Sequence, residues 1–331
     1  MGTEPHRGKV RGALPRLVDW LACPVCRRRG ELDQPLAVAG NSLVCPQRHC
    51  LDVARDGHVT MTTHRAGANA DTAAMVAARQ RVLDAGIFDP LDDALTAILS
   101  GRTRLCEVGA GTGHHLSRVL SGDPEGRSWG LATDVSPAAV RVAARAHPRM
   151  AAVVADTWAG LPLRTGALDA LVCVFAPRHA PEFARVLAPG GLLVTATPGP
   201  GHLAQLRERG ILIGMQSGKQ QALEDSLAPH LEVVERRSLH HEVWADAGLV
   251  ADIVAMGPSA HHRRDLARPT GCTVDVEVEV TTFAPAPTPP TPGSREGSGR
   301  VGGPALAQQR CRPAVGSDLA VSPRRPPPWP R

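Results

Sequence analysis

The chain is poor in aromatic residues and contains no tyrosine. Aromatics make up 3% of its 331 residues, namely four phenylalanines and five tryptophans. A surface that stacks many nucleic-acid bases on aromatic rings is therefore a weak hypothesis. The chain also lacks a run of about 18 apolar residues that would cross a bilayer, and its first residues lack an apolar signal segment. We therefore expect no membrane contact and a cytoplasmic location.

Positive charge is concentrated at the two ends of the chain. Residues 1–70 carry a net charge of +4 and residues 284–331 carry +5, whereas residues 71–283 carry −4. A basic end beside a mildly acidic centre suits an anionic macromolecule that one part of the protein holds and another part modifies. Arginine-rich ends that are merely solvated give the same pattern, so charge alone does not decide.

Four of the eight cysteines cluster near the N-terminus. Cys23 and Cys26 form a C-x2-C pair, and Cys45 and His49 form a C-x3-H pair. Both spacings are typical of tetrahedral zinc, and four protein ligands leave no open position, so the metal would be structural. Cys50 competes with His49 as the fourth ligand, and the common C-x3-H spacing favours His49. Buried free cysteines are the alternative explanation.

The order of apolar segments predicts an α/β fold with a doubly wound parallel sheet, because strand candidates alternate with helices. The strand candidates lie at Leu105–Val108, Trp129–Thr133, Ala152–Ala155, Ala170–Phe175 and Leu192–Thr197. The intervening helices are expected at His115–Leu120, Pro137–Ala146 and Pro181–Leu187. Two later strands are expected at Leu231–Val234 and Val274–Thr282, and strict alternation in the second is typical of an edge or antiparallel strand.

Composition and patterning divide the chain into five parts. The predicted parts are a flexible leader (1–15), a zinc-binding module (16–64), a helical linker (65–101), the α/β domain (102–283) and a disordered proline-rich tail (284–331). The linker contains helices expected at Asp71–Ala85 and Leu91–Leu99. The tail has twelve prolines in 48 positions, so it buries too little apolar surface to fold.

A glycine-rich turn follows the first strand of the α/β domain. Glu107 precedes Gly109, Gly111 and Gly113, which allow a sharp turn and a close approach of the backbone to a ligand. Asp134 and Asp156 end the next two strands, where carboxylates can bind ribose hydroxyls and an adenine edge. Three acidic residues suit the positively charged S-adenosylmethionine better than the pyrophosphate of NAD. The alternatives are an ordinary glycine turn and a helix-capping Asp134.

Longer segments carry a family resemblance. The segments CPVC, CPQRHCLDVARDGHV, DTAAMVAARQRVLDAGIFDPL, EVGAGTGHH, DALVCVFAPR, ATPGPGHL and VAMGPS span about residues 20–283. Together they resemble the RlmA family of 23S rRNA guanine-N1 methyltransferases. GTGHHLSRVL and VRVAARAHPR are most similar to its actinobacterial branch, which confers resistance to tylosin- and mycinamicin-type macrolides.

The resemblance implies a seven-stranded, Rossmann-like S-adenosylmethionine-dependent methyltransferase domain behind the zinc module. It assigns the zinc ligands to Cys23, Cys26, Cys45 and His49. It assigns cofactor contacts to Phe88, Gly111, Thr112 and His202, although an exposed histidine at a helix start is the alternative for His202. The loop Phe175-Ala-Pro-Arg178 would face the methyl group, and no catalytic residue is assigned.

The reaction implied is methylation of N1 of guanine 748, in a 23S rRNA hairpin loop at the exit tunnel. The expected partners are 23S rRNA, in the large ribosomal subunit or its precursor, and a second copy of the chain in a homodimer. The rRNA phosphates would be bound by arginines of the zinc module, namely Arg27, Arg28, Arg29 and Arg48; solvated arginines are the alternative.

Two other function classes compete with rRNA methylation. The first is a small-molecule methyltransferase of an antibiotic pathway, with the zinc site as a brace. The second is a non-enzymatic zinc interaction module on a degenerate cofactor fold, against which the intact Glu107, Gly111, Asp134 and Asp156 argue.

Overall fold

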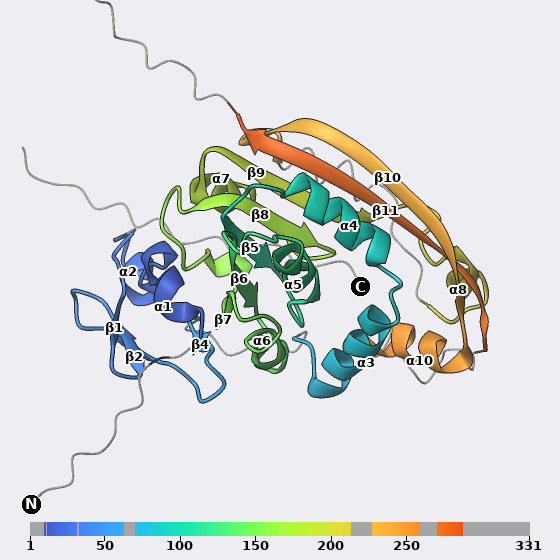
Figure 1. Ribbon diagram of the computed structural model, residues 1–331, viewed down its shortest axis with the longest axis horizontal. Coiled ribbons are helices and arrows are strands. Elements are labelled where there is room, and N and C mark those ends of the chain that lie inside the picture. The colour runs from blue at the N-terminus through green and yellow to red at the C-terminus, as the bar shows by residue number, and fades with distance from the viewer. Residues whose placement is uncertain are drawn as a thin grey trace, which may run out of the picture. The chain divides into compact units, whose positions relative to one another are not determined.

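An eight-stranded mixed sheet organises the chain (Figure 1). The computed structural model describes residues 10, 12–31, 33–62, 70–212, 227–257 and 270–286. The strand order is β10-β11-β9-β8-β5-β6-β7-β4. The strands are β4 (Val59–Thr60), β5 (Arg104–Val108), β6 (Trp129–Asp134), β7 (Met150–Val154), β8 (Leu168–Val174), β9 (Leu187–Pro198), β10 (Leu231–Ala245) and β11 (Cys272–Pro285).

The six strands from β9 to β4 are parallel, whereas β11 pairs antiparallel with both β9 and β10. Seven of the eight strands, β5 to β11, belong to the predicted methyltransferase part, so the seven-stranded α/β prediction is confirmed. The eighth, β4, comes from the N-terminal module and extends the sheet beside β7.

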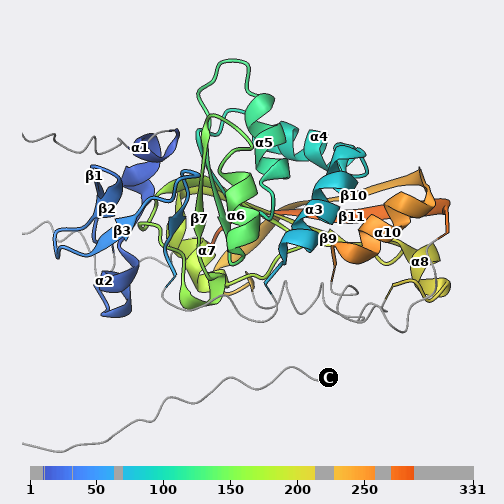
Figure 2. The ribbon, with the colours of Figure 1, turned by 90° about the horizontal axis from the view of Figure 1, so that it is seen from below.

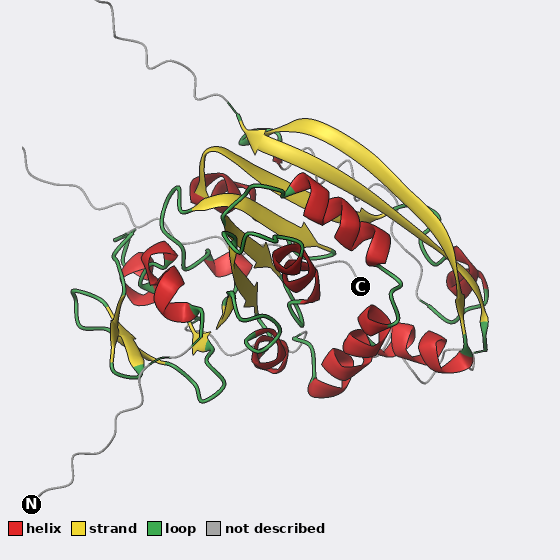
Figure 3. Ribbon diagram, viewed as in Figure 1, coloured by secondary structure: helices red, strands yellow, loops and turns green. Residues whose placement is uncertain are grey.

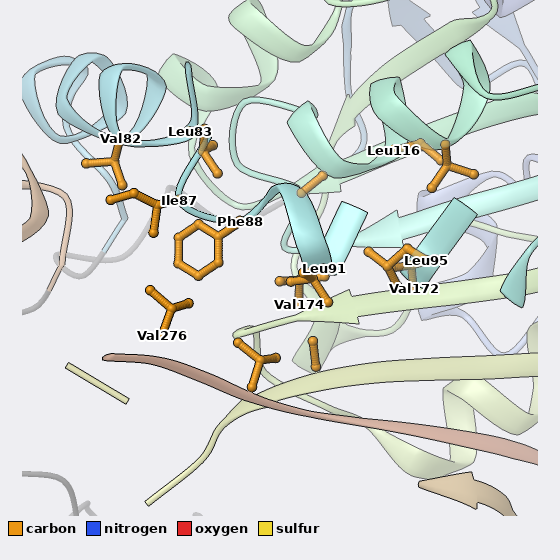
Figure 4. Close-up of a cluster of buried hydrophobic side chains, with 14 of the residues drawn as sticks. Val82, Leu83, Ile87, Phe88, Leu91, Leu95, Leu116, Val172, Val174 and Val276 are labelled. Atoms are coloured by element: carbon orange, nitrogen blue, oxygen red, sulfur yellow. The ribbon is translucent and has the colours of Figure 1, made fainter. Parts of the chain in front are cut away.

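Helices α4, α5 and α6 pack on one face of the sheet. Apolar residues of these helices share a buried cluster with alternate residues of the central strands, among them Leu105 of β5 and Val172 of β8. Figure 4 shows Leu91, Leu95 and Leu116 of this cluster. The helices on this side are α3 (Ala73–Asp84), α4 (Asp89–Ile98), α5 (His114–Ser121), α6 (Pro137–Ala143), α8 (Ala204–Glu208) and α10 (Ala247–Ala255).

The cysteine module covers the opposite face together with α7 (Ala180–Val186). Its apolar residues, such as Leu17 and Leu21, share a second buried cluster with Cys106 and Leu171 of the sheet. Figure 2 shows the module beside β7. It consists of α1 (Leu14–Leu17), the 3-10 turn η1 (Val18–Trp20), α2 (Pro24–Arg28), β1 (Ala37–Ala39), β2 (Ser42–Val44) and β3 (Cys50–Asp52).

The connection from β7 to β8 has only the short 3-10 turn η2 (Thr157–Ala159) where a doubly wound fold usually has a helix. The module fills this place: Ala22 N donates to Pro162 O at 3.0 Å, and Leu21 forms an isolated bridge with Leu163. The domain boundaries at residues 64 and 101 stay predictions. The N-terminal module shares one core with the α/β domain, and the linker helices share another core with it.

Two predicted segments can be compared with the structure. In the predicted leader (1–15), Ala13 and Leu14 are buried in the core that the module shares with the sheet, and the boundary at residue 15 stays a prediction. Leu231–Val234 is the start of a much longer strand, β10, which forms a long ribbon with β11 (Figure 3). The tail from residue 287 onward lies outside the described residues. Among the described helices, none is both long and apolar enough to span a membrane.

Gly113 tests how tightly the glycine turn packs on the sheet. It has a φ of +74°, and a Cβ there would lie 2.7 Å from Met150 Cε and 3.1 Å from Ala143 Cβ. Gly113→Ala is expected to destabilise the chain by about 2–4 kcal/mol, combining the left-handed backbone cost with overpacking. Gly190→Ala is the matched control, because Gly190 also has a φ of +74° but no atom within 4 Å. Its expected cost is about 1–2 kcal/mol. Urea unfolding of both variants checks this, and equal losses would contradict a packing role for Gly113.

Candidate functional site

The four predicted zinc ligands converge in the N-terminal module. Cys26 Sγ lies 3.8 Å from Cys45 Sγ, and His49 Nδ1 lies 3.3 Å from both sulfurs and 3.6 Å from Cys23 Sγ. A tetrahedral zinc ion keeps two sulfurs about 3.8 Å apart, and a sulfur and a nitrogen about 3.5 Å apart. The cluster therefore has the dimensions of a Cys3His zinc site.

Cys50 is not part of this cluster. It is exposed at the start of β3, whereas the three other cysteines are buried. Burial and the neighbouring thiols raise the pKa of Cys26 to about 12, so a bound cation is needed to hold it as a thiolate. Between the two candidates for the fourth ligand, the geometry favours His49.

The glycine turn is held by the carboxylate of Asp134. Its Oδ2 accepts from Gly111 N at 2.9 Å, and its Oδ1 accepts from Ser136 N at 2.8 Å. Burial raises the pKa of Asp134 despite these bonds. Because Gly109, Gly111 and Gly113 all have positive φ, the turn needs glycine at each position.

A pocket of about 260 Å³ opens at the carboxyl ends of β5 and β8. Five predicted cofactor residues line it: Phe88, Glu107, Gly109, Gly111 and His202. The other four predicted cofactor contacts, Thr112, Gly113, Asp134 and Asp156, are not among the residues that line the pocket. Gly113 packs against Met150, as described above, and Thr112 is buried with a hydroxyl that has no hydrogen-bond partner.

Three rings meet at the mouth of this pocket. Phe88 lies 5.6 Å from Phe175 and 6.1 Å from His202, between ring centroids. Figure 4 shows Phe88 among Ile87, Leu91 and Val276. Burial lowers the pKa of His202 to about 4, so its ring is neutral at pH 7, and its buried Nδ1 lacks a partner. His202 Nδ1 is thus an unsatisfied polar atom at the pocket, of the kind that a bound polar cofactor would satisfy.

A network beside the pocket was missed at the level of sequence. Asp92 of α4 is 1% exposed and accepts from His115 Nδ1 at 2.6 Å and from His114 Nε2 at 3.0 Å. Burial alone would raise the pKa of Asp92, but these two hydrogen bonds hold it at about 2. Burial alone would lower the pKa of His115, but its hydrogen bond to Asp92 raises it. The signal was the pair of histidines directly after the glycine turn, which ties α4 to α5.

The comparisons with known proteins agree with this geometry. A family model described as a methyltransferase domain matches residues 106–195. The 23S rRNA (guanine(748)-N(1))-methyltransferase of Streptomyces fradiae is 40% identical over 257 residues, covering 75% of this chain and 88% of the relative. A protein of Micromonospora griseorubida named for 23S rRNA (guanine-N(1)-)-methyltransferase activity is 40% identical over 288 residues, covering 82% and 96%. The chain belongs to the 23S rRNA guanine-N1 methyltransferase family.

Asp156 and Arg27 make contacts that the sequence did not predict. Asp156 was expected at an adenine edge, which stays a prediction, and it is not among the pocket residues. Its Oδ1 instead accepts from Trp158 N at 2.9 Å and caps the turn η2. Arg27 was expected to contact phosphate, but it is 13% exposed and its Nη2 lies 2.5 Å from Glu182 Oε1. Arg28, Arg29 and Arg48 are exposed, as expected.

The zinc ligands give a metal-content prediction. Cys26→Ala is expected to release zinc from the methyltransferase and to unfold its N-terminal module, because one of four ligands is lost. Cys50→Ala is the matched control and is expected to retain one zinc per chain, since Cys50 lies outside the cluster. Elemental analysis of both purified variants measures this. Loss of zinc from Cys50→Ala would refute the ligand set.

Glu107 gives a pH prediction. Burial raises its pKa to about 7, although the nearby His115 and a bond from Leu116 N at 3.1 Å oppose the rise. Folding therefore takes up a proton between the unfolded pKa of about 4.3 and pH 7. The free energy of unfolding that Glu107 contributes should fall as pH rises through this window. Glu107→Gln is expected to remove that fall.

Urea unfolding at pH 5, 6 and 7 compares wild type with Glu107→Gln. Glu182→Gln is the control: burial is outweighed at Glu182 by Arg185 and Arg27, which lower its pKa, so its titration lies below the window. The Glu182→Gln variant should therefore be less stable than wild type by the same amount at all three pH values. Parallel curves for wild type and Glu107→Gln would show that Glu107 is ionised throughout.

Proposed function

We propose that the chain transfers the methyl group of S-adenosylmethionine to N1 of guanine 748 in 23S rRNA. The observation that carries this is the 40% identity to the Streptomyces fradiae enzyme named for that reaction, over 88% of that enzyme's length. Methylation there would protect the ribosome from tylosin- and mycinamicin-type macrolides. The substrate would be the large subunit or its precursor, in the cytoplasm.

The cofactor would bind in the pocket between α4 and the glycine turn. Phe88, Gly109, Gly111 and His202 line it, together with Glu107, whose ionised form a bound sulfonium would favour. Asp134 shapes the turn through Gly111, and the neighbouring Thr112 lies in the same turn with a buried hydroxyl that has no partner. S-adenosylmethionine supplies the methyl group when bound.

The loop after β8 would position the target guanine. Phe175 is 39% exposed and has a φ of +50°, a backbone conformation that bulky residues rarely adopt. The thiol of Cys173 donates to Ala176 O at 3.5 Å, and Phe175 N donates to Ala196 O at 3.0 Å, so the loop is fixed. Strain maintained by surrounding structure is common at functional sites. Guanine N1 lies on the Watson–Crick edge, so the base must be unpaired to reach this loop.

The N-terminal module would hold the rRNA backbone. Arg28, Arg29 and Arg48 are exposed and free to approach phosphates, whereas Arg27 holds the module to α7. The zinc ion would keep these arginines in place and would take no part in the chemistry. A homodimer would suit the outer edge of β10, which pairs with no other described strand; sedimentation of the purified chain measures this.

Primer extension on 23S rRNA tests the proposal. Cells expressing the chain should give a reverse-transcription stop at guanine 748, because an N1-methyl group blocks base pairing, and should tolerate tylosin. Cells expressing Asp134→Ala should give neither, since the glycine turn loses its carboxylate. If purified protein binds S-adenosylmethionine by calorimetry but labels only small molecules, rRNA is not the substrate.

A further inference from the structure

Trp158 is an exposed tryptophan beside the proposed catalytic loop. Its side chain belongs to the turn η2, directly after β7, and is 58% exposed. Tryptophan is among the side chains whose burial stabilises a fold most, so this exposure has no benefit to the fold itself. His179 lies against it, with ring centroids 6.0 Å apart and planes inclined by 40°.

The backbone of Trp158 and the ring of His179 are each held by a hydrogen bond. Asp156 Oδ1 accepts from Trp158 N at 2.9 Å, and His179 Nδ1 donates to Thr157 O at 3.2 Å. His179 also immediately precedes α7, four residues after Phe175. The pair therefore belongs to the loops at the carboxyl ends of β7 and β8.

The same turn contacts the N-terminal module. A Cβ at Gly160 would lie 2.8 Å from Arg27 Nη2, so the arginine packs directly on the turn. Arg27 in turn pairs with Glu182 of α7, and the exposed Arg28 and Arg29 follow it along the chain. The turn that carries Trp158 therefore contacts the N-terminal module through Arg27, and it contacts the loop that follows Phe175 through His179.

We propose that Trp158, supported by His179, is a stacking site for an unpaired base that flanks the target guanine. Single-stranded RNA is recognised by bases stacked on aromatic rings while arginines bind the backbone. A hairpin loop held by the module and inserted into the pocket would pass this ring. The site rests on the proposed rRNA function and extends it from the target base to its neighbour.

Methylation kinetics on a hairpin RNA carrying the guanine 748 loop test the site. Trp158→Ala is expected to raise KM for the RNA about 10- to 100-fold, the loss of one stacked base. The kcat should stay unchanged, because a flanking base binds equally in the ground and transition states. Trp158→Phe should recover most of the affinity. Trp244→Ala is the matched control, because Trp244 is 68% exposed on β10 at the other end of the sheet order.

Two further measurements separate the outcomes. Calorimetric affinity for S-adenosylmethionine should be the same in all variants, and RNA should quench a tryptophan emission that Trp158→Phe lacks and Trp244→Phe retains. If Trp158→Ala keeps the wild-type KM while the wild type is active, the stacking site is wrong and the methyl transfer stands. If the wild type methylates no RNA, the proposed function is wrong and the stacking site falls with it.

Discussion

A parallel sheet must be covered on both faces, and in this chain one cover depends on the cysteine module. The crossover from β7 to β8 contains only a 3-10 turn. It therefore supplies no helix to cover the apolar side chains of Cys106, Leu131 and Leu171 on that face of the sheet. The module supplies Leu17 and Leu21 to that face and adds β4 to the sheet. A segment of this size has little core of its own, so a metal that orders the module also completes the sheet.

This arrangement gives the arginines of the module two different roles. Arg27 follows the ligand Cys26 directly and turns inward to Glu182, which also accepts from Leu161 N at 3.0 Å and pairs with Arg185. A largely buried ion pair of this kind stabilises the fold only when all its partners are present, because a buried charge without a partner is strongly destabilising. Arg28 and Arg29, by contrast, are exposed to solvent. One charged run in the sequence therefore contains both a structural contact and a candidate RNA surface.

The central strands could be predicted from sequence because burial on both faces makes them continuous apolar runs. β10 could not be predicted along its length, because most of its residues are exposed and Glu235, Arg236 and Arg237 interrupt any apolar alternation. The glycine turn was predictable from its spacing, and so was the metal cluster. The turn cap made by Asp156 was not predictable, because a carboxylate at a strand end caps a turn as readily as it binds a ligand. The Asp92 network depends on residues 22 and 23 positions apart, which no local pattern brings together.

The scarcity of aromatics argues against a surface that stacks many bases, whereas the proposed site needs a single exposed ring. An average over 331 residues says nothing of where the few rings are placed. Phe183 and Phe283 are buried in the core, whereas Phe175 and Trp158 are exposed at the carboxyl edge of the sheet, where a substrate would enter. The proposed cofactor pocket shares its core with α3, α4 and α5, but the Trp158 turn is joined through Arg27 to the cysteine module. Loss of the metal should therefore weaken RNA binding more than cofactor binding, because the two sites rest on opposite faces of the sheet.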